Sequence, residues 1–376
     1  MTDRTATDPP STTRDVDPPT DGAPVSSPTA TGDVLAPWQT ISEPARARRR
    51  KLFLLLGALF AVVSGIFGFP TGREVITAWV LALLLAACGG EWRVWRRAVL
   101  RDWAPLIAVL FAYDFLRGQA NELGGRLADL PALRNGKPGT AGIDHAHVLP
   151  QLRADEWLFG WWTGGEVPTV WLQDRLYVPG DVQWYDILIV PVYMSHFLVP
   201  MALAVALWIS SYHLFRRYVW TLVALTVATL TTYALFPAAP PWMASMNGYL
   251  PEGVARVTSV TLQSTGVGTI RSAVQQGEAY ANAVAAIPSL HSAVPFMVLL
   301  FTWPLVRRTT RALLALYVLA MTFTLTYGGE HYIVDAFIGW AYAAAAVYGV
   351  AWMFRRRERH EPLGTGAPVT ADPASR

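Results

Sequence analysis

Charged residues and cysteine are scarce in this chain. Only 15% of its 376 residues are charged, whereas 53% are hydrophobic, a balance that excludes an ordinary soluble protein of this length. The single cysteine, Cys88, excludes a disulfide within the chain, and its apolar surroundings favour a structural role. The formal net charge of +3 gives no reason to expect a nucleic-acid partner. The composition therefore indicates a polytopic membrane protein.

We also expect no cleavable secretory signal. The first apolar run begins near Leu52, is too long for the core of a cleaved signal, and follows a basic cluster that suits a retained first span. Residues 1–44 and 356–376 are polar and lack aliphatic periodicity, so we expect two disordered cytoplasmic tails. Between them we expect two extra N-terminal membrane helices in 45–101 and a catalytic membrane domain in 102–355.

Apolar runs predict the fold class. They are separated by charged or Pro/Gly-rich breaks, and several lie at the short end of the roughly 17 to 25 residues that cross a bilayer. The prediction is an all-α bundle of about eight transmembrane helices, over residues 52–69, 75–89, 103–116, 187–209, 219–236, 292–306, 312–327 and 333–354.

Basic residues predict the orientation of these spans. If the first span runs outward, 18 of the 30 lysines and arginines fall in the short inner segments, as the positive-inside rule requires. Two long segments, about 118–186 and 237–287, then form outer loops. We expect a plasma-membrane protein with both termini in the cytoplasm, and a cap on the outer membrane surface that contains Trp157, Trp161, Trp162, Trp171 and Trp184.

Two short motifs carry the chemistry. The sequence Pro-Ser-Leu-His occupies residues 288–291, and His-Tyr-x-x-Asp-x-x-x-Gly occupies residues 331–339. The spacing places His331 and Asp335 on one face of a helix. A carboxylate that orients one imidazole nitrogen leaves the other free to attack or to accept a proton. Both motifs fall at the outer face in the predicted orientation.

These motifs resemble the second and third signature motifs of the type 2 phosphatidic acid phosphatase superfamily. Within it they are most similar to the branch of inositol phosphorylceramide synthase and the sphingomyelin synthases, which residues 185–200 and 236–242 also fit. The resemblance covers roughly residues 100–355 and implies a six-helix catalytic core. Two features depart from the ordinary phosphatases: Leu290 replaces a glycine, and Thr324-Leu325 replace a Ser-Arg pair that supplies a phosphate-clamping arginine.

Phosphoryl transfer needs a nucleophile, a proton donor for the leaving oxygen, and donors aimed at the phosphate. We assign His331 as the nucleophile, Asp335 as the acceptor that orients it, and His291 as the acid and then the base. We expect Ser289 to cap a helix starting at His291 and to aim its backbone N–H groups at the phosphate. The scheme requires no metal and no cofactor.

Other candidates for binding the substrate follow from charge and position. Arg117, at the outer end of the third span, is the first choice for the missing phosphate clamp, followed by Arg271 and Arg256. Tyr332 is a further phosphate-binding candidate. His196 lies deeper in a span and is also a substrate-binding candidate, because an ionisable group there indicates a functional role; a structural hydrogen bond or a place lining the lipid cavity is the alternative. For His145 and His147, whose spacing can suit a metal, we favour a solvated loop.

The sequence thus predicts a membrane enzyme that acts on a phosphorylated lipid at the outer face. Its partners are the membrane, a lipid phosphate donor, and either an alcohol acceptor, as in an inositolphosphotransferase, or water, as in a lipid phosphate or polyprenyl phosphate phosphatase. A third possibility is a proton-coupled lipid transporter, although such proteins place ionisable groups near the midplane and show related halves. The oligomeric state stays open.

Overall fold

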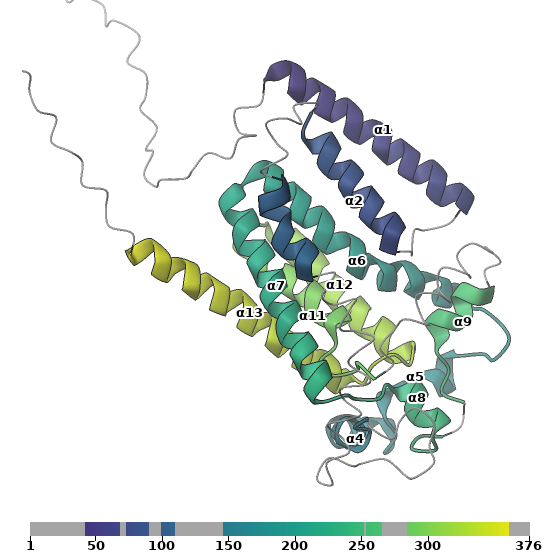
Figure 1. The fold of residues 1–376 in the computed structure, drawn as a ribbon. Helices are drawn as coiled ribbons and strands as arrows, with labels where there is room; N and C mark the ends of the chain where they lie inside the picture. Colours follow the sequence, from purple (N-terminus) through teal and green to yellow (C-terminus); the bar gives the residue numbers. More distant parts are fainter. Residues whose placement is uncertain are drawn as a thin grey trace, which may run out of the picture. The chain divides into compact units, whose positions relative to one another are not determined.

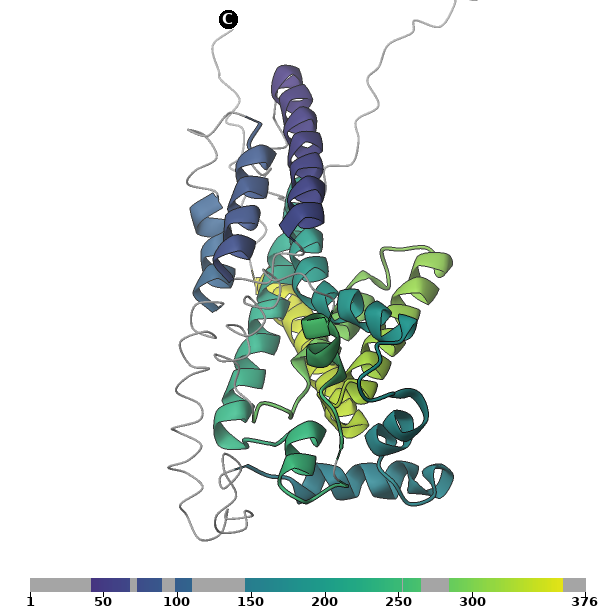
Figure 2. The same cartoon turned by 90° about the vertical axis from the view of Figure 1, so that its right-hand side faces the viewer.

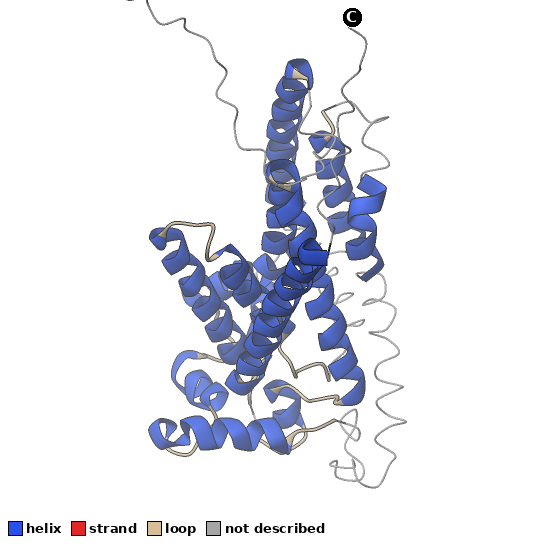
Figure 3. Cartoon of the chain, turned by 90° about the vertical axis from the view of Figure 1, so that its left-hand side faces the viewer, coloured by secondary structure: helices blue, strands red, loops and turns tan. Residues whose placement is uncertain are grey.

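The structure is a computed structural model, and it describes residues 42–67, 73–89, 99–109, 146–251, 253–264 and 284–360. All regular elements within these residues are helices (Figures 1 and 3). Two isolated bridges join Ala238 to His147 and to Ala285. The predicted all-α class is therefore confirmed.

Each predicted apolar run overlaps a helix. Among the described residues, four helices are long and apolar enough to cross a membrane: α6 (Trp184–Ser210), α7 (Tyr212–Leu235), α12 (Arg308–Tyr327) and α13 (Ile333–His360). The remaining runs overlap α1 (Glu43–Phe67), α2 (Arg73–Ala87), a helix over residues 99–109, and the short α11 (Leu290–Thr302). The number of spans, about eight, remains a prediction.

The short helix α11 is the centre of the bundle. It packs against α6, α7, α12 and α13, and most of its side chains are buried, including Ala293, Met297 and Phe301. A helix that is apolar all round belongs inside a bundle. Because α11 begins at Leu290, this packing places the first histidine motif at one end of the buried helix.

The backbones of α11 and α13 meet where Gly339 faces Ser289. A Cβ atom at position 339 would stand 2.5 Å from the Ser289 carbonyl oxygen, which is closer than two such atoms can pack. One turn earlier in α13, the Asp335 carbonyl accepts a hydrogen bond of 3.0 Å from the Ser289 N–H. Gly339 thus lets the two motifs approach each other.

We therefore expect Gly339→Ala to destabilise the protein by about 1–3 kcal/mol, because the added methyl group forces the two helices apart. Gly349→Ala is the matched control, since a Cβ at this position in the same helix meets no atom within 4 Å and alanine favours helix. Thermal unfolding in detergent should show a lower midpoint for the first variant only. Equal midpoints for the two variants would contradict this account of the glycine.

Short helices form a cap at the end of the bundle where α13 begins. They are α4 (Leu149–Thr163), α5 (Pro168–Leu176), α8 (Pro241–Met246) and α9 (Val257–Ser264). In Figure 2, α4 lies crosswise to the long helices, and it contacts α13. Trp157 and Trp161 on α4 are 81% and 85% exposed, an exposure that suits a membrane interface.

Candidate active site

His331 lies in the turn between α12 and α13. The turn passes through Gly329, whose φ of +73° is in the left-handed region that favours glycine. The N–H groups of Glu330 and His331 both donate to the Leu325 carbonyl. Because α13 begins at Ile333, His331 precedes the helix, whereas the sequence placed it on the same helical face as Asp335.

The two side chains nevertheless meet. Asp335 lies in the first turn of α13, and its Oδ2 accepts a hydrogen bond of 2.9 Å from the Tyr332 N–H, as an acidic residue in the first turn of a helix often does. The same oxygen is 3.5 Å from His331 Nδ1. Both side chains are buried, and Asp335 is wholly so. The Asp335 carboxylate therefore faces the imidazole, but it is not the nearest hydrogen-bond partner of the ring.

The shortest bond of the His331 ring is to a backbone carbonyl. Nδ1 lies 3.0 Å from the Ala286 oxygen. A carbonyl oxygen only accepts hydrogen bonds, so Nδ1 carries a proton, and in the neutral ring Nε2 has the free lone pair. Sequence reasoning assigned this orienting role to Asp335 alone and missed Ala286. The carbonyl fixes the tautomer, while the nearby carboxylate stabilises positive charge on the ring.

His291 and His196 extend the site. The His291 ring, in the first turn of α11, has its centroid 6.1 Å from that of His331 and 4.3 Å from that of His196 on α6. The Tyr193 ring also stacks on the His291 ring, with 4.7 Å between their centroids. Among the described residues, buried His291 Nε2 and His196 Nδ1 have no hydrogen-bond partner. Buried polar atoms without partners are costly, so these nitrogens mark a place for a polar ligand.

Ser289 caps α11, as the sequence predicted. The helix begins one residue earlier than expected, at Leu290, and the Ser289 hydroxyl accepts a hydrogen bond of 3.4 Å from the Ser292 N–H. Ser289 is wholly buried, and its own N–H donates to the Asp335 carbonyl. It therefore joins the start of the helix that carries His291 to the helix that carries Asp335.

Of the arginine candidates, only Arg256 is among the described residues; Arg117 and Arg271 lie outside them. Arg256 Nε donates to Glu330 Oε1 at 2.8 Å, and Glu330 immediately precedes His331. The guanidinium lies 5.4 Å from the centre of the Trp242 ring. The structure therefore brings to the residue before His331 a cation that the sequence ranked behind Arg117.

Tyr332 has a different environment from the other candidates. Its side chain is wholly buried in the apolar cluster of the cap, together with Leu152, Val170 and Met243. Burial and the nearby carboxylates, first among them Asp335, raise the pKa of its phenol well above the usual value. The contact that Tyr332 makes within the site is the hydrogen bond from its backbone N–H to Asp335.

Asp155, which the sequence did not single out, contacts the site from α4. Its Oδ2 accepts from the Ile333 N–H at 3.0 Å and its Oδ1 from the Val334 N–H at 2.9 Å. The side chain is wholly buried. An acidic residue in the middle of an amphipathic helix normally faces solvent, so local sequence patterns give no signal for this contact.

Burial raises the pKa of Asp155 to about 7, and the negative charge of Asp335 adds a smaller increase. The two backbone hydrogen bonds favour the ionised form and oppose this rise. In the unfolded chain the group ionises near pH 4. Between about pH 4 and pH 7 the folded protein thus binds more protons than the unfolded chain, and this group makes stability fall as the pH rises.

We expect Asp155→Asn to remove that pH dependence. Unfolding midpoints in detergent, measured from pH 4 to pH 8, should decline less steeply with rising pH in the variant than in the wild type. The exposed neighbour Glu156 offers Glu156→Gln as a control that should keep the wild-type slope. Parallel curves for Asp155→Asn and wild type would show that the carboxyl does not titrate in this range.

No group of three or more His, Cys, Asp or Glu side chains among the described residues is arranged to hold a metal ion. His145 lies outside the described residues, and His147 stacks on Phe236 at 3.7 Å between ring centroids. Because His147 is buried, the expectation of a solvated loop was wrong for this residue. Burial lowers its pKa.

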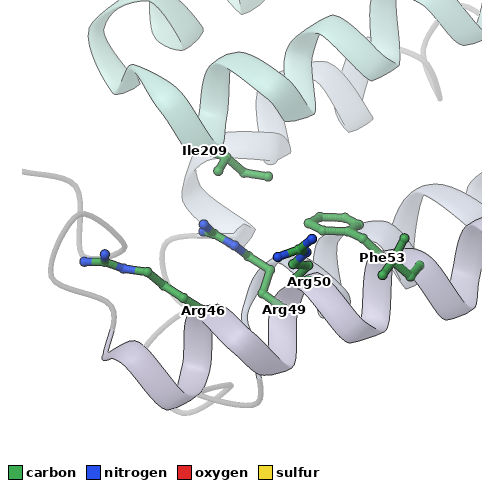
Figure 4. Close-up of a pocket in the computed structure, with 6 residues that line it drawn as sticks. Arg46, Arg49, Arg50, Phe53 and Ile209 are labelled. Atoms are coloured by element: carbon green, nitrogen blue, oxygen red, sulfur yellow. The ribbon is translucent and has the colours of Figure 1, made fainter.

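An open cavity of about 520 Å³ lies away from the histidines. Figure 4 shows Arg46, Arg49 and Arg50 of α1 near Ile209 of α6. These arginines belong to the first predicted inner cluster, and Ile209 is near the C-terminal end of α6. None of the lining residues belongs to the site built around His331.

Comparisons with known proteins support the resemblance drawn from the two motifs. Residues 171–349 match the family model described as the PAP2 superfamily. This segment contains His196, Arg256, His291, His331 and Asp335. The match supports a membrane-associated enzyme of the phosphatase type that acts on a lipid phosphate. No curated protein and no solved structure matches the chain.

Proposed function

We propose that this protein is a lipid phosphotransferase of the inositol phosphorylceramide synthase kind, in which His331 carries the phosphoryl group as a phosphohistidine. The observation that supports this most strongly is the His331 ring itself. Its Nδ1 is held by the Ala286 carbonyl at 3.0 Å and faces Asp335 at 3.5 Å. Its Nε2 is then the available nucleophile, and His291 is near enough for both rings to contact one phosphoryl group.

The reaction has two steps. In the first, the Nε2 lone pair of His331 attacks phosphorus, the bond from phosphorus to the lipid oxygen breaks, and protonated His291 gives its proton to that oxygen. In the second, His291 takes the proton of an acceptor hydroxyl, whose oxygen attacks phosphorus and releases His331. Asp335 stabilises the positive charge that His331 gains in the first step. Protons and phosphate are thus balanced over one cycle.

We assign Arg256 as the phosphate clamp. Gln173 fixes the preceding residue, because its amide both donates to the Ala255 carbonyl and accepts from the Ala255 N–H, each at 2.8 Å. Glu330 then holds Arg256 beside His331. A guanidinium matches the oxygens of a phosphate. The position of the family's clamping arginine is taken by Leu325, which is 1% exposed and packed in the interior.

Arg256→Ala is expected to lower kcat/KM for a lipid phosphate donor about 100-fold, the effect of losing one group that stabilises a transition-state charge. Arg256→Lys should recover only part of the loss, because an ammonium lacks the planar fork. The control is Arg175→Ala on α5, an exposed arginine that stacks on Trp171 and should leave the rate unchanged. Equal kcat/KM in Arg256→Ala and wild type would exclude the clamp.

The outer face is the proposed location of the chemistry. The arginines at 307–311 precede or begin α12 and those at 355–359 end α13, while His331 lies in the turn that joins the opposite ends of the two helices. By the positive-inside rule these arginines lie in the cytoplasm. The site then faces outward in the plasma membrane.

The acceptor decides between transfer and hydrolysis. Leu290 and Thr324-Leu325, which differ from the ordinary phosphatases, favour an alcohol. The test uses purified protein in detergent with phosphorus-labelled phospholipid or polyprenyl phosphate, with and without inositol or another alcohol. A labelled alcohol or lipid adduct supports the transferase, and free phosphate alone supports a phosphatase. No turnover of any donor would contradict both.

A further inference from the structure

The start of α13 is held by two carboxylates, of which one comes from a distant helix. The first N–H groups of a helix have no partner within it. Tyr332 donates to Asp335, whereas Ile333 and Val334 donate to the two oxygens of Asp155 on α4. A negative group at this end also matches the helix dipole. Asp155 therefore fixes the turn between His331 and Asp335 from outside the bundle.

The same helix also reaches the carbonyl that holds the His331 ring. One turn before Asp155, the buried Gln151 amide donates to the carbonyls of His147 and Ala239. The Ala239 N–H in turn donates to the His147 carbonyl at 2.9 Å. These bonds connect α4 to the segment at His147 and to the segment at Ala238 and Ala239.

These segments lead directly to Ala286. The Ala238 N–H donates to the Val284 carbonyl at 2.7 Å, and the Ala286 N–H donates to the Ala238 carbonyl at 3.1 Å. The Ala286 carbonyl then accepts from His331 Nδ1. Gln151 thus supports one partner of the His331 ring, and Asp155 supports the helix that carries the other partner, Asp335.

We propose that Asp155 is a positioning residue for His331: from α4, its carboxylate fixes the first turn of α13 and so the place of Asp335 relative to the nucleophile. This inference rests on the proposed function of His331. Both oxygens of the Asp155 carboxylate accept hydrogen bonds from backbone N–H groups of α13, so we assign it no contact with the phosphate or the acceptor. Its loss should slow the chemical steps and leave the affinity for the donor lipid nearly unchanged.

The test compares kcat and KM for wild type, Asp155→Asn and Leu152→Ala with a labelled lipid phosphate. Leu152 lies one turn before Glu156 on α4, is 5% exposed and packs in the cap cluster, so its truncation loosens α4 without removing either hydrogen bond to α13. We expect Asp155→Asn to lower kcat at least about tenfold, with KM within about twofold, because misplacement of a reacting group is costly. Leu152→Ala should keep kcat closer to wild type at a similar loss of thermal stability.

Two results would overturn the inference: an unchanged kcat in Asp155→Asn, or an equal fall of kcat in both variants at matched stability, which would reduce Asp155 to general support of the fold. If Asp155→Asn does not fold, Asp155→Glu replaces it, because the longer side chain shifts the carboxylate relative to α13; it should lower kcat more than Leu152→Ala at matched stability, and an equal or smaller fall would overturn the inference. His331→Ala is assayed in parallel. Activity in that variant would contradict the proposed function itself, whereas its loss together with a normal Asp155→Asn would contradict only the positioning role.

Discussion

His331→Ala is expected to abolish turnover of every lipid phosphate donor, with a fall in kcat of at least about 1000-fold, because removal of a covalent nucleophile can cost far more than this. The ring is buried, its Nδ1 is committed to the Ala286 carbonyl, and Asp335 lies against it. No other described side chain combines these features. The measurement is release or transfer of labelled phosphorus by protein purified in detergent.

His213→Ala is the matched control for this variant. His213 lies on α7, and its exposed ring pairs with Glu358 at 3.2 Å, far along the sequence from either motif. The control should keep the wild-type rate and expression level. Wild-type turnover in His331→Ala would rule out the mechanism, whatever the reaction product.

His291→Ala is expected to lower kcat for a lipid donor about 100- to 1000-fold, because the ring serves as acid in one step and as base in the next. The two steps should respond differently to the leaving group. A nitrophenyl phosphate ester leaves without a proton, so the first step should recover with such a donor. The second step still lacks its base, so the phosphorylated enzyme should accumulate. Its formation should appear as a burst of nitrophenol.

His196→Ala helps to interpret that result. The His196 ring packs against His291, with 4.3 Å between their centroids, and the proposed mechanism gives it no proton to move, so its loss should reduce the rate less than loss of His291. A nitrophenol burst should be absent in His331→Ala. A burst of equal size in His331→Ala would place the phosphoryl group on another residue.

Local sequence patterns were sufficient for the helices and for part of the site. Apolar runs predicted α6, α7, α12 and α13 because a membrane span must be long and apolar, and Ser289 was recognised as a cap because serine is favoured there. The apolar run over 333–354 also predicted the start of α13 at residue 333, but the expectation that His331 shares a helical face with Asp335 was wrong, because the turn through Gly328 and Gly329 leaves His331 before the helix.

The partners of His331 from elsewhere in the chain could not be read from the sequence. Ala286 acts through its backbone carbonyl, which every residue type possesses. Asp155 contacts α13 from 178 residues away, in a helix whose sequence suggests a solvated acidic position. Arg256 was ranked behind Arg117 because distance along the chain says nothing of the Glu330 bond that brings it to the site.

The most direct test of the account is to find the phosphoryl group on the protein. His291→Ala is incubated with a labelled nitrophenyl phosphate donor, quenched in alkali, digested and mapped, because a phosphohistidine survives base and is lost in acid. The account predicts acid-labile phosphorus on the peptide that contains His331, and none on that peptide in His331→Ala. Turnover without any label on His331, or with the label on another residue, would contradict it.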